Sequence, residues 1–262
     1  MNEVPVPFAV PERLQVVDST NRYLADLARA GLPDGSEVPE GYAVTAERQS
    51  EGRGRLTRRW EAPYGSSVLC SILFKPALQP EQLHLTAWAV ALAAVQACRE
   101  AAGVDLTLKW PNDLLSAERK VGGVLSQTVP PASVVVGIGI NVNWPPHWPP
   151  PDSDDPELAA IAVRATSLNR VAGREISRRE LAGRLVREAG RRNAALRSDE
   201  GRRALASEYR RVCATIGRDV RVELQDETVT GRALDVDDLG RLLVVTDART
   251  RAISAGDVVH LR

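Results

Sequence analysis

The sequence predicts an α+β fold, with a two-layer α/β body built on a mixed β-sheet and a small β-barrel at the C-terminus. In the first 212 residues, apolar runs of strand length alternate with longer helical stretches. Residues 213–262 instead hold short alternating strands, which are separated by turns such as Asp237-Asp238-Leu239-Gly240. We therefore expect two domains, 1–212 and 213–262.

The first elements of the body are marked by residues typical of helix ends. A helix is predicted over Thr20–Ala30, because Asp18-Ser19 supplies N-cap oxygens and Gly31 follows the last turn. A second helix, Pro80–Ala102, has proline in its first turn and glycine after its end. The apolar runs between these helices predict two strands, at Tyr42–Ala46 and Ser67–Phe74, with a polar loop over 48–59.

The second half of the body continues the sheet and then turns helical. Strands are predicted at Leu106–Trp110, Val121–Val129 and Ser133–Val142, and the last is apolar on both faces, so we expect it to be central. Trp144–Pro156 is rich in proline and is expected to be a surface loop. A capping box, Ser177-Arg178-Arg179-Glu180, predicts a helix to about residue 196, and another follows over 200–212. In the tail, strands are predicted at Val220–Leu224, Thr228–Leu234, Leu242–Thr246 and Val258–Leu261.

Composition limits the possible functions. The 34 basic and 34 acidic residues give a net charge of zero, which disfavours nucleic acid or an anionic membrane as a partner. The longest apolar run, Leu83–Cys98, is too short to cross a bilayer, and Met1–Leu14 lacks the apolar stretch of a signal peptide. The three cysteines form no CxxC pair. We therefore expect a cytoplasmic protein without a membrane segment.

The first motif with chemical content is the loop Gly52–Trp60, which reads Gly-Arg-Gly-Arg-Leu-Thr-Arg-Arg-Trp. Its glycines allow backbone N–H groups to come close to a ligand. Its arginines repel one another unless an anion joins them, and phosphate or carboxylate is the natural guest. Taken alone, the motif also fits a solvated basic loop or a loop that contacts RNA.

The second motif is Lys109-Trp110-Pro111-Asn112-Asp113, followed by Lys120 ahead of two glycines. Only three of the 34 basic residues are lysines, and two of them fall here, where a compact point charge has a use that a guanidinium does not replace. Asp113, beside Asn112, is a candidate Mg²⁺ ligand. From the spacing alone, a structural Pro-Asn-Asp turn is the simpler interpretation.

Two further motifs are less specific. The strand segment Gly137-Ile138-Gly139-Ile140-Asn141 places alternating glycines in a buried strand, which leaves a flat floor for a ligand or, equally, for a packed helix. The segment Asp18-Ser19-Thr20-Asn21 is a helix N-cap that also offers hydroxyls and free N–H groups to a ligand carbonyl.

In this order, the motifs make the chain resemble the biotin–protein ligases over nearly its whole length. The Lys-Trp-Pro-Asn-Asp motif is the most specific, and the β-rich tail resembles the family's C-terminal SH3-like barrel. Leu56-Thr57 departs from the usual loop sequence. The resemblance implies biotin contacts from Ser19, Thr20, Asn21, Gln49, Gly52, Arg53, Gly54, Arg55, Trp60, Lys120, Gly123, Gly137 and Gly139. It implies adenylate contacts from Arg55, Arg58, Trp60, Lys109, Asn112, Asp113, Lys120 and Asn141, and catalytic roles for Lys120, Arg55 and Arg53.

The implied protein is a two-domain enzyme, with a mixed-sheet catalytic domain of the biotin/lipoate ligase type at 1–212 and a barrel at 213–262. It uses ATP and biotin as substrates with Mg²⁺, for which Asp113 is the implied ligand, and makes biotinyl-5′-adenylate. It then transfers biotin to a lysine of a biotin carboxyl carrier protein, a subunit of acetyl-CoA carboxylase. We expect a monomer or homodimer, and no DNA binding, because no winged helix precedes Asp18.

Three alternatives remain open at this point. A lipoate–protein ligase or an octanoyl or lipoyl transferase has a similar architecture, although we would not expect both the Gly-Arg-Gly-Arg loop and the Lys-Trp-Pro-Asn-Asp turn there. A catalytically idle ligand-binding regulator would have lost Lys120 or Arg55, and both are present. A nucleic-acid-binding regulator is the third alternative.

Overall fold

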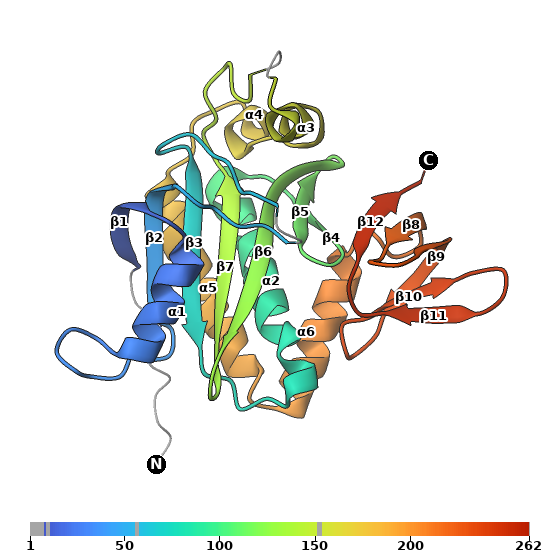
Figure 1. The fold of residues 1–262 in the computed structure, drawn as a ribbon, viewed down its shortest axis with the longest axis horizontal. Coiled ribbons are helices and arrows are strands. Elements are labelled where there is room, and N and C mark those ends of the chain that lie inside the picture. The colour runs from blue at the N-terminus through green and yellow to red at the C-terminus, as the bar shows by residue number, and fades with distance from the viewer. Residues whose placement is uncertain (1–7, 9–10, 56–57, 151–153, 262) are drawn as a thin grey trace.

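A computed structural model describes residues 8, 11–55, 58–150 and 154–261, so Leu56, Thr57 and most of the first ten residues lie outside it. The body is one seven-stranded sheet in the order β1-β2-β3-β7-β6-β5-β4 (Figure 1). The sheet is mixed, because β1 runs parallel to β2 and all other neighbours are antiparallel. Its strands are β1 (Glu12–Val17), β2 (Ala43–Gln49), β3 (Ser67–Phe74), β4 (Thr107–Lys109), β5 (Asp113–Ser116), β6 (Arg119–Val129) and β7 (Ser133–Asn141).

Helices cover the two faces of this sheet unequally. Helices α2 (His84–Ala102), α5 (Arg178–Ala195) and α6 (Asp199–Val212) lie behind the sheet in Figure 1, where they bury the main core. Among the helices that the structure describes, α1 (Thr20–Ala30) lies in front of the sheet in that view, and it packs its buried Leu24 near Val44, Leu73 and Val135. Beside α1, this front face is crossed by the loop between β2 and β3 and not by a helix.

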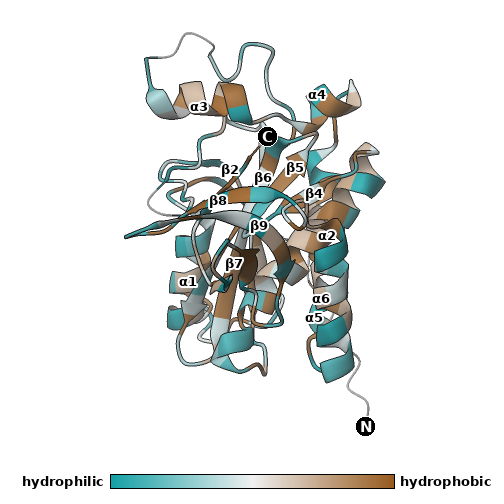
Figure 2. Ribbon diagram, turned by 90° about the vertical axis from the view of Figure 1, so that its right-hand side faces the viewer, coloured by the Kyte–Doolittle hydropathy of each residue, from teal (hydrophilic) through white to brown (hydrophobic). Residues whose placement is uncertain are grey.

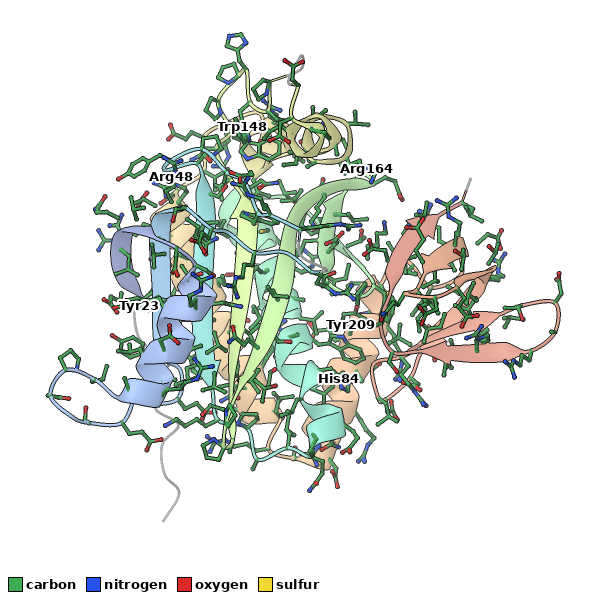
Figure 3. The ribbon with its side chains drawn as sticks, in the orientation of Figure 1. Tyr23, Arg48, His84, Trp148, Arg164 and Tyr209 are labelled. Atoms are coloured by element: carbon green, nitrogen blue, oxygen red, sulfur yellow. The ribbon has the colours of Figure 1, made fainter. Side chains whose placement is uncertain are left out.

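The helix sequences explain these positions. Helix α2 is buried along nearly its whole length, as its alanine-rich and apolar sequence requires, and it ends at Gly103 with φ of 70°. Its Trp88 stacks on Tyr209 of α6 with ring centroids 4.1 Å apart, and His84 meets the same indole edge-on (Figure 3). Figure 2 shows the hydrophobic β7 inside the body and hydrophilic residues on the outer sides of α1 and α6.

The tail forms a separate five-stranded antiparallel sheet in the order β11-β10-β9-β8-β12 (right in Figure 1). Among the described residues no pairing joins β11 to β12, so the strand pairs form a row. Several hydrogen bonds connect this tail to the body. Among them, Trp110 Nε1 donates to Gly240 O (2.9 Å), and Ala214 N donates to Leu108 O (2.7 Å). The strands are β8 (Asp219–Glu223), β9 (Thr228–Val236), β10 (Leu242–Val245), β11 (Thr250–Ile253) and β12 (Asp257–His260).

The structure confirms the predicted α+β class and corrects several elements. Trp144–Pro156 is not only a surface loop, because Trp144 is 3% exposed, and α3 begins at Pro156. The predicted Pro80–Ala102 helix opens with a 3₁₀ turn, Pro80–Gln82, before α2 begins at His84. Five elements were missed: β1, β5, α3 (Pro156–Arg164), α4 (Leu168–Ala172) and β11. The domain boundary between residues 212 and 213 stays a prediction.

Candidate functional site

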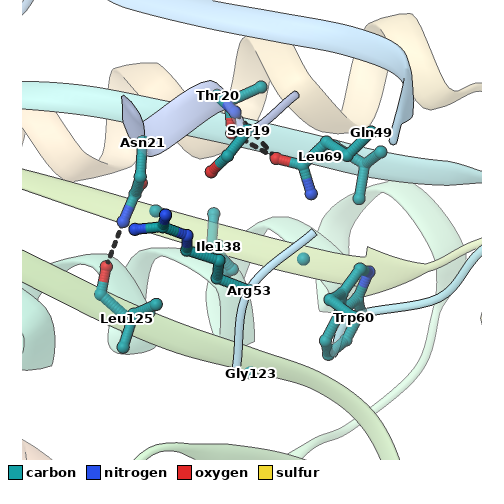
Figure 4. A pocket seen from close by; sticks show the side chains of 12 residues that line it. Ser19, Thr20, Asn21, Gln49, Arg53, Trp60, Leu69, Gly123, Leu125 and Ile138 are labelled. Carbon is teal, nitrogen blue, oxygen red and sulfur yellow. Dashed lines mark hydrogen bonds between the residues drawn. The ribbon is translucent and has the colours of Figure 1, made fainter. Parts of the chain in front are cut away.

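A pocket lies on the front face of the sheet, beside the N-terminus of α1 (Figure 4). It holds about 350 Å³ of empty space, part of it open to solvent. Its walls come from segments far apart in the sequence, namely α1, the end of β2, the arginine loop and strands β3, β6 and β7. It is lined by Ser19, Thr20, Asn21, Gln49, Arg53, Trp60, Leu69, Gly123, Leu125, Gly137, Ile138 and Gly139.

Two glycines of β7 make room for the pocket walls. A Cβ at Gly137 would lie 2.0 Å from Asn21 Oδ1, and a Cβ at Gly139 would lie 2.5 Å from the indole of Trp60. No real side chain tolerates such distances, so both glycines are required by close approach of another side chain. The two glycines are thus covered by the side chains of Asn21 and Trp60, and their direct contact with a ligand stays a prediction.

The arginine loop folds back on itself as a small hairpin. Trp60 N donates to Gly52 O (2.9 Å), Gly54 N donates to Arg58 O (2.7 Å), and Arg53 pairs with Arg59 in an antiparallel bridge. A Cβ at Gly52 would lie 2.3 Å from Trp60 O, so only glycine allows the hairpin to close here. The hairpin sends Arg53 and Trp60 into the pocket, and Trp60 Nε1 is buried without a hydrogen-bond partner among the described residues.

Lys120 lies between this pocket and a second group of polar residues. Its ammonium is 2.6 Å from Asp113 Oδ1 and 5.8 Å from the centroid of the Trp60 ring. The arrangement follows from the sheet, where β5 pairs with β6 so that Asp113 opposes Gly123. Because Gly123 has no side chain, Lys120 and Asp113 meet over its backbone, about where its Cβ would contact both.

Lys109 is a half-buried cation near the same carboxylate. Burial lowers its pKa, and the charge of Lys120 lowers it further, whereas Asp113 raises it. Lys109 and Lys120 both lie near Asp113, and Asp257 also raises the pKa of Lys109. The two neighbouring ammonium groups suit an anionic ligand such as a phosphate chain.

Arg55 and Arg58 do not line the pocket, and their side chains contact the C-terminal tail. Arg55 Nη1 lies 3.3 Å from Gly256 O and 3.5 Å from Asn112 Oδ1, and Arg58 forms an ion pair with Asp257. Burial lowers the pKa of Arg55, although Asp257 and Asp113 oppose this. Asn112 also donates to Val124 O (2.9 Å), which fixes the turn between β4 and β5.

The structure brings together most of the residues predicted to bind biotin. Nine of them line the pocket: Ser19, Thr20, Asn21, Gln49, Arg53, Trp60, Gly123, Gly137 and Gly139. Gly52 and Gly54 line a neighbouring groove, together with Arg53 and Arg58. Asn141 lies apart from both, because it is 3% exposed and its amide donates to Thr166 O (3.0 Å).

Sequence reasoning missed Leu69, Leu125 and Ile138 as lining residues. Each is one apolar residue within an apolar strand, and such a strand has no local feature that separates a ligand contact from core packing. Their positions follow only from the sheet order, which sets β3, β7 and β6 side by side.

The predicted Mg²⁺ site has few protein ligands. Within the described residues, no group of three or more His, Cys, Asp or Glu side chains is placed to hold a metal ion. Asp113 and Asn112 provide one carboxylate and one amide oxygen, and Lys120 already contacts the carboxylate. This donor set fits an ion that also uses substrate phosphates as ligands, and not an ion caged by the protein alone.

Comparison with known proteins identifies the class of protein that has this fold and site. A model of the Biotin/lipoate A/B protein ligase family matches residues 14–143, and a model of the Biotin protein ligase C terminal domain matches residues 215–261. The biotin–[acetyl-CoA-carboxylase] ligase of Mycobacterium tuberculosis is 38% identical, over 95% of this chain and 90% of that protein. The chain belongs to the biotin–protein ligase family.

Two further comparisons agree with that membership. The bifunctional ligase/repressor BirA of Bacillus subtilis is 32% identical, over 93% of this chain and 71% of that protein. A solved structure of the biotin protein ligase from Aquifex aeolicus in complex with biotin and ATP is 26% identical, with a TM-score of 0.78 over 97% of this chain and all of that chain. In the described residues, none of the helices has the length and apolar character needed to cross a bilayer.

Proposed function

We propose that this chain is an ATP-dependent ligase that activates biotin as biotinyl-5′-adenylate and transfers it to a lysine of a biotin carboxyl carrier protein. The observation that carries the proposal is the position of Lys120. Its ammonium lies between the Trp60 wall of the pocket and Asp113 of the Lys-Trp-Pro-Asn-Asp motif. One cation is thus within reach of a ligand in the pocket and of a nucleotide beside it.

The proposed first step joins two anions. The biotin carboxylate attacks the α-phosphorus of ATP, a C–O–P linkage forms, and pyrophosphate leaves with the electrons of the broken P–O bond. In water the two anions repel each other, so the site must provide positive charge in advance. Lys120 is proposed to bind both the carboxylate and the α-phosphate, and Arg53 to bind the carboxylate from the pocket side.

The nucleotide is proposed to lie between the hairpin and the C-terminal sheet. Arg55, Arg58, Lys109, Asn112 and Trp60 are the residues proposed to bind the adenylate. Mg²⁺ bound with ATP supplies further positive charge to the phosphates, and Asp113 with Asn112 would hold it. The side-chain amide of Asn141 donates to Thr166 O, and we propose that Asn141 positions the residues of the adenylate site without touching the adenylate.

In the second step, a lysine amine of the acceptor attacks the acyl carbonyl of the mixed anhydride. The C–N bond forms, AMP leaves, and the amine loses a proton to solvent. No nucleophile from this chain is needed. We propose that Arg55 assists this step by stabilising the negative charge on the departing phosphate, since its side chain is half-buried.

The proposal also includes the acceptor protein, the cellular location and the oligomeric state. The Mycobacterium tuberculosis relative is named for acetyl-CoA carboxylase, and we propose the biotin carrier subunit of that enzyme as the acceptor here. The three cysteines are free and buried, which supports a cytoplasmic location. A monomer or homodimer without DNA binding remains our expectation, and light scattering with a DNA gel-shift assay would test it.

The alternative is a lipoate–protein ligase, because one matching family model covers both biotin and lipoate enzymes. The match of residues 215–261 to a biotin-specific C-terminal domain favours biotin. The test is ATP–pyrophosphate exchange with biotin and, separately, with lipoate. Exchange that requires biotin supports the proposal, exchange with lipoate alone supports the alternative, and no exchange with either supports an idle binding protein.

A further inference from the structure

Ser71 of β3 lies beneath the pocket at the centre of a buried hydrogen-bond chain. It is 0% exposed, and its Oγ lies 2.8 Å from Thr20 Oγ1 and 2.6 Å from Asn21 Oδ1. Thr20 Oγ1 in turn lies 3.0 Å from Gln49 Oε1, which also accepts from Thr20 N (2.8 Å). Ser71 belongs to none of the sequence motifs and does not line the pocket.

The contacts give this chain a direction. Asn21 Nδ2 donates to Leu125 O (3.0 Å), so Asn21 Oδ1 is an acceptor, and it shares the single hydrogen of Ser71 with Thr20 Oγ1. The hydroxyl of Thr20 in turn donates to Gln49 Oε1. An amide oxygen accepts two hydrogen bonds, so Gln49 Oε1 takes both the backbone N–H and the hydroxyl of Thr20.

The consequence appears at the pocket wall. With its hydrogen directed to Gln49 Oε1 and one lone pair taken by the Ser71 hydroxyl, Thr20 Oγ1 keeps one lone pair. Thr20 and Gln49 both line the pocket. A hydroxyl oxygen whose own hydrogen is already bound, and which still has a lone pair, is suited to a ligand N–H. Biotin carries N–H donors on the ureido edge of its ring, whereas the dithiolane ring of lipoate carries none.

We propose that Ser71 is a positioning residue that gives the pocket its selectivity for the ureido group of biotin. It orients the Thr20 hydroxyl as an acceptor, and it holds the Asn21 amide over Gly137. The inference rests on the proposed function and goes beyond it, because it assigns ligand selectivity to a residue that the ligand does not touch.

The test uses the full chain and steady-state ATP–pyrophosphate exchange. Biotin-dependent exchange by the unaltered protein is required first, and its failure would refute the proposed function rather than the role of Ser71. Ser71→Ala is then expected to raise the KM for biotin about tenfold, with the KM for ATP changed less than about twofold, since one hydrogen-bonded contact is lost.

Ser67→Ala is the matched control. Ser67 lies on the same face of the same strand and is 2% exposed, but its Oγ has no hydrogen-bond partner within the described residues. This variant is expected to keep the KM for biotin of the unaltered protein. Ser71→Thr retains the hydroxyl and is expected to restore most of the affinity, which separates lost hydrogen bonding from lost folding.

A double-mutant cycle decides whether Ser71 acts through Thr20. Thr20→Val removes the acceptor but keeps the side-chain shape, so Ser71→Ala added to it is expected to raise the KM for biotin by only about two- to threefold. The proposal is overturned if the tenfold factor persists in the Thr20→Val background, if Ser67→Ala has the same effect as Ser71→Ala, or if the KM values for biotin and ATP rise together.

Discussion

The ammonium of Lys120 and the carboxylate of Asp113 are 2.6 Å apart across the β5–β6 strand pair. Both side chains are partly exposed, at 35% and 23%, so the ion pair contributes little to the stability of the fold. Its importance is chemical, because any anion that binds Lys120 must compete with Asp113 for the same ammonium.

Removing the Lys120 ammonium should abolish biotin-dependent exchange. We expect Lys120→Ala to lower the rate by at least about 100-fold, because a preplaced cation opposes the repulsion between carboxylate and phosphate. Lys120→Arg should remain strongly impaired, since a guanidinium is larger and differently shaped. Lys75→Ala, which removes a lysine that pairs with Glu37, is the control. A rate within about threefold of the unaltered protein would contradict the role of Lys120.

Asp113→Asn should raise the Mg²⁺ concentration that the reaction needs. The substitution keeps the shape of the side chain but removes the carboxylate charge, and hard cations prefer carboxylate oxygens. The measurement is the exchange rate during a Mg²⁺ titration at fixed ATP. Asp105→Asn, whose carboxylate pairs with Arg99 at the surface, is the control. An unchanged Mg²⁺ dependence would remove Asp113 from the list of metal ligands.

Gly139→Ala should displace the Trp60 indole and weaken biotin binding. Its new Cβ would lie 2.5 Å from the ring, so the ring must leave the pocket wall. We expect at least about a tenfold weaker affinity by calorimetry, with a loss of stability of about 1–3 kcal/mol from overpacking. Gly183→Ala in α5 is the matched control, because its Cβ would meet only the Arg187 guanidinium at 3.5 Å. Equal affinities for the two variants would show that Trp60 is not held by Gly139.

Because of Lys109, the stability of the protein should change with pH in the alkaline range. Burial lowers its folded pKa, so between that pKa and the ordinary lysine value the unfolded chain binds more protons, and stability rises with pH. At neutral pH the cost of burying the charge is fully present. Lys109→Met should therefore raise Tm at neutral pH, with an advantage that shrinks as pH rises toward about 10.

Lys109→Met should stabilise the fold but weaken the binding of ATP. Loss of the Lys109 charge should raise the KM for ATP, whether it results from mutation or from alkaline pH. Lys75→Met controls for removing a lysine elsewhere, and it should leave both the pH dependence of Tm and the KM for ATP unchanged. A Tm advantage of Lys109→Met that stays constant across the pH range would rule out this titration.

The sequence was sufficient for the elements that carry strong local patterns. Thr20–Ala30 and Ser67–Phe74 were predicted with their observed bounds, because a capped helix and an apolar strand are visible in single segments. Strand β1 was missed because its Glu-Arg-Leu-Gln-Val-Val sequence alternates only weakly, as is common at a sheet edge. Strand β5 was missed because Pro111-Asn112-Asp113 indicates a turn, whereas Asp113 already starts the strand.

The functional site also contains some residues that the sequence predicts and others that it does not. Gln49, Arg53, Trp60 and Gly139 were predicted from the motifs that the family resemblance singled out, and they meet at one pocket. The contacts between the hairpin and the tail were not predictable, because nothing local to Arg58 points to a carboxylate two hundred residues later. Ser71 was also hidden, since a serine within an apolar strand has the same local appearance whether or not its hydroxyl has a partner, as Ser67 shows.

The reach of Arg55 and Arg58 to residues 256 and 257 has a consequence for how such chains diverge. Arg55 and Arg58 obtain a carbonyl and a carboxylate from residues that follow them by 201 and 199 positions in the chain. The two parts are therefore not interchangeable modules. A hybrid that joins this body to the tail of another member would keep its arginines correctly oriented only if the donor tail brought an acidic residue to the same turn, so recombination within the family should be restricted to tails that carry one.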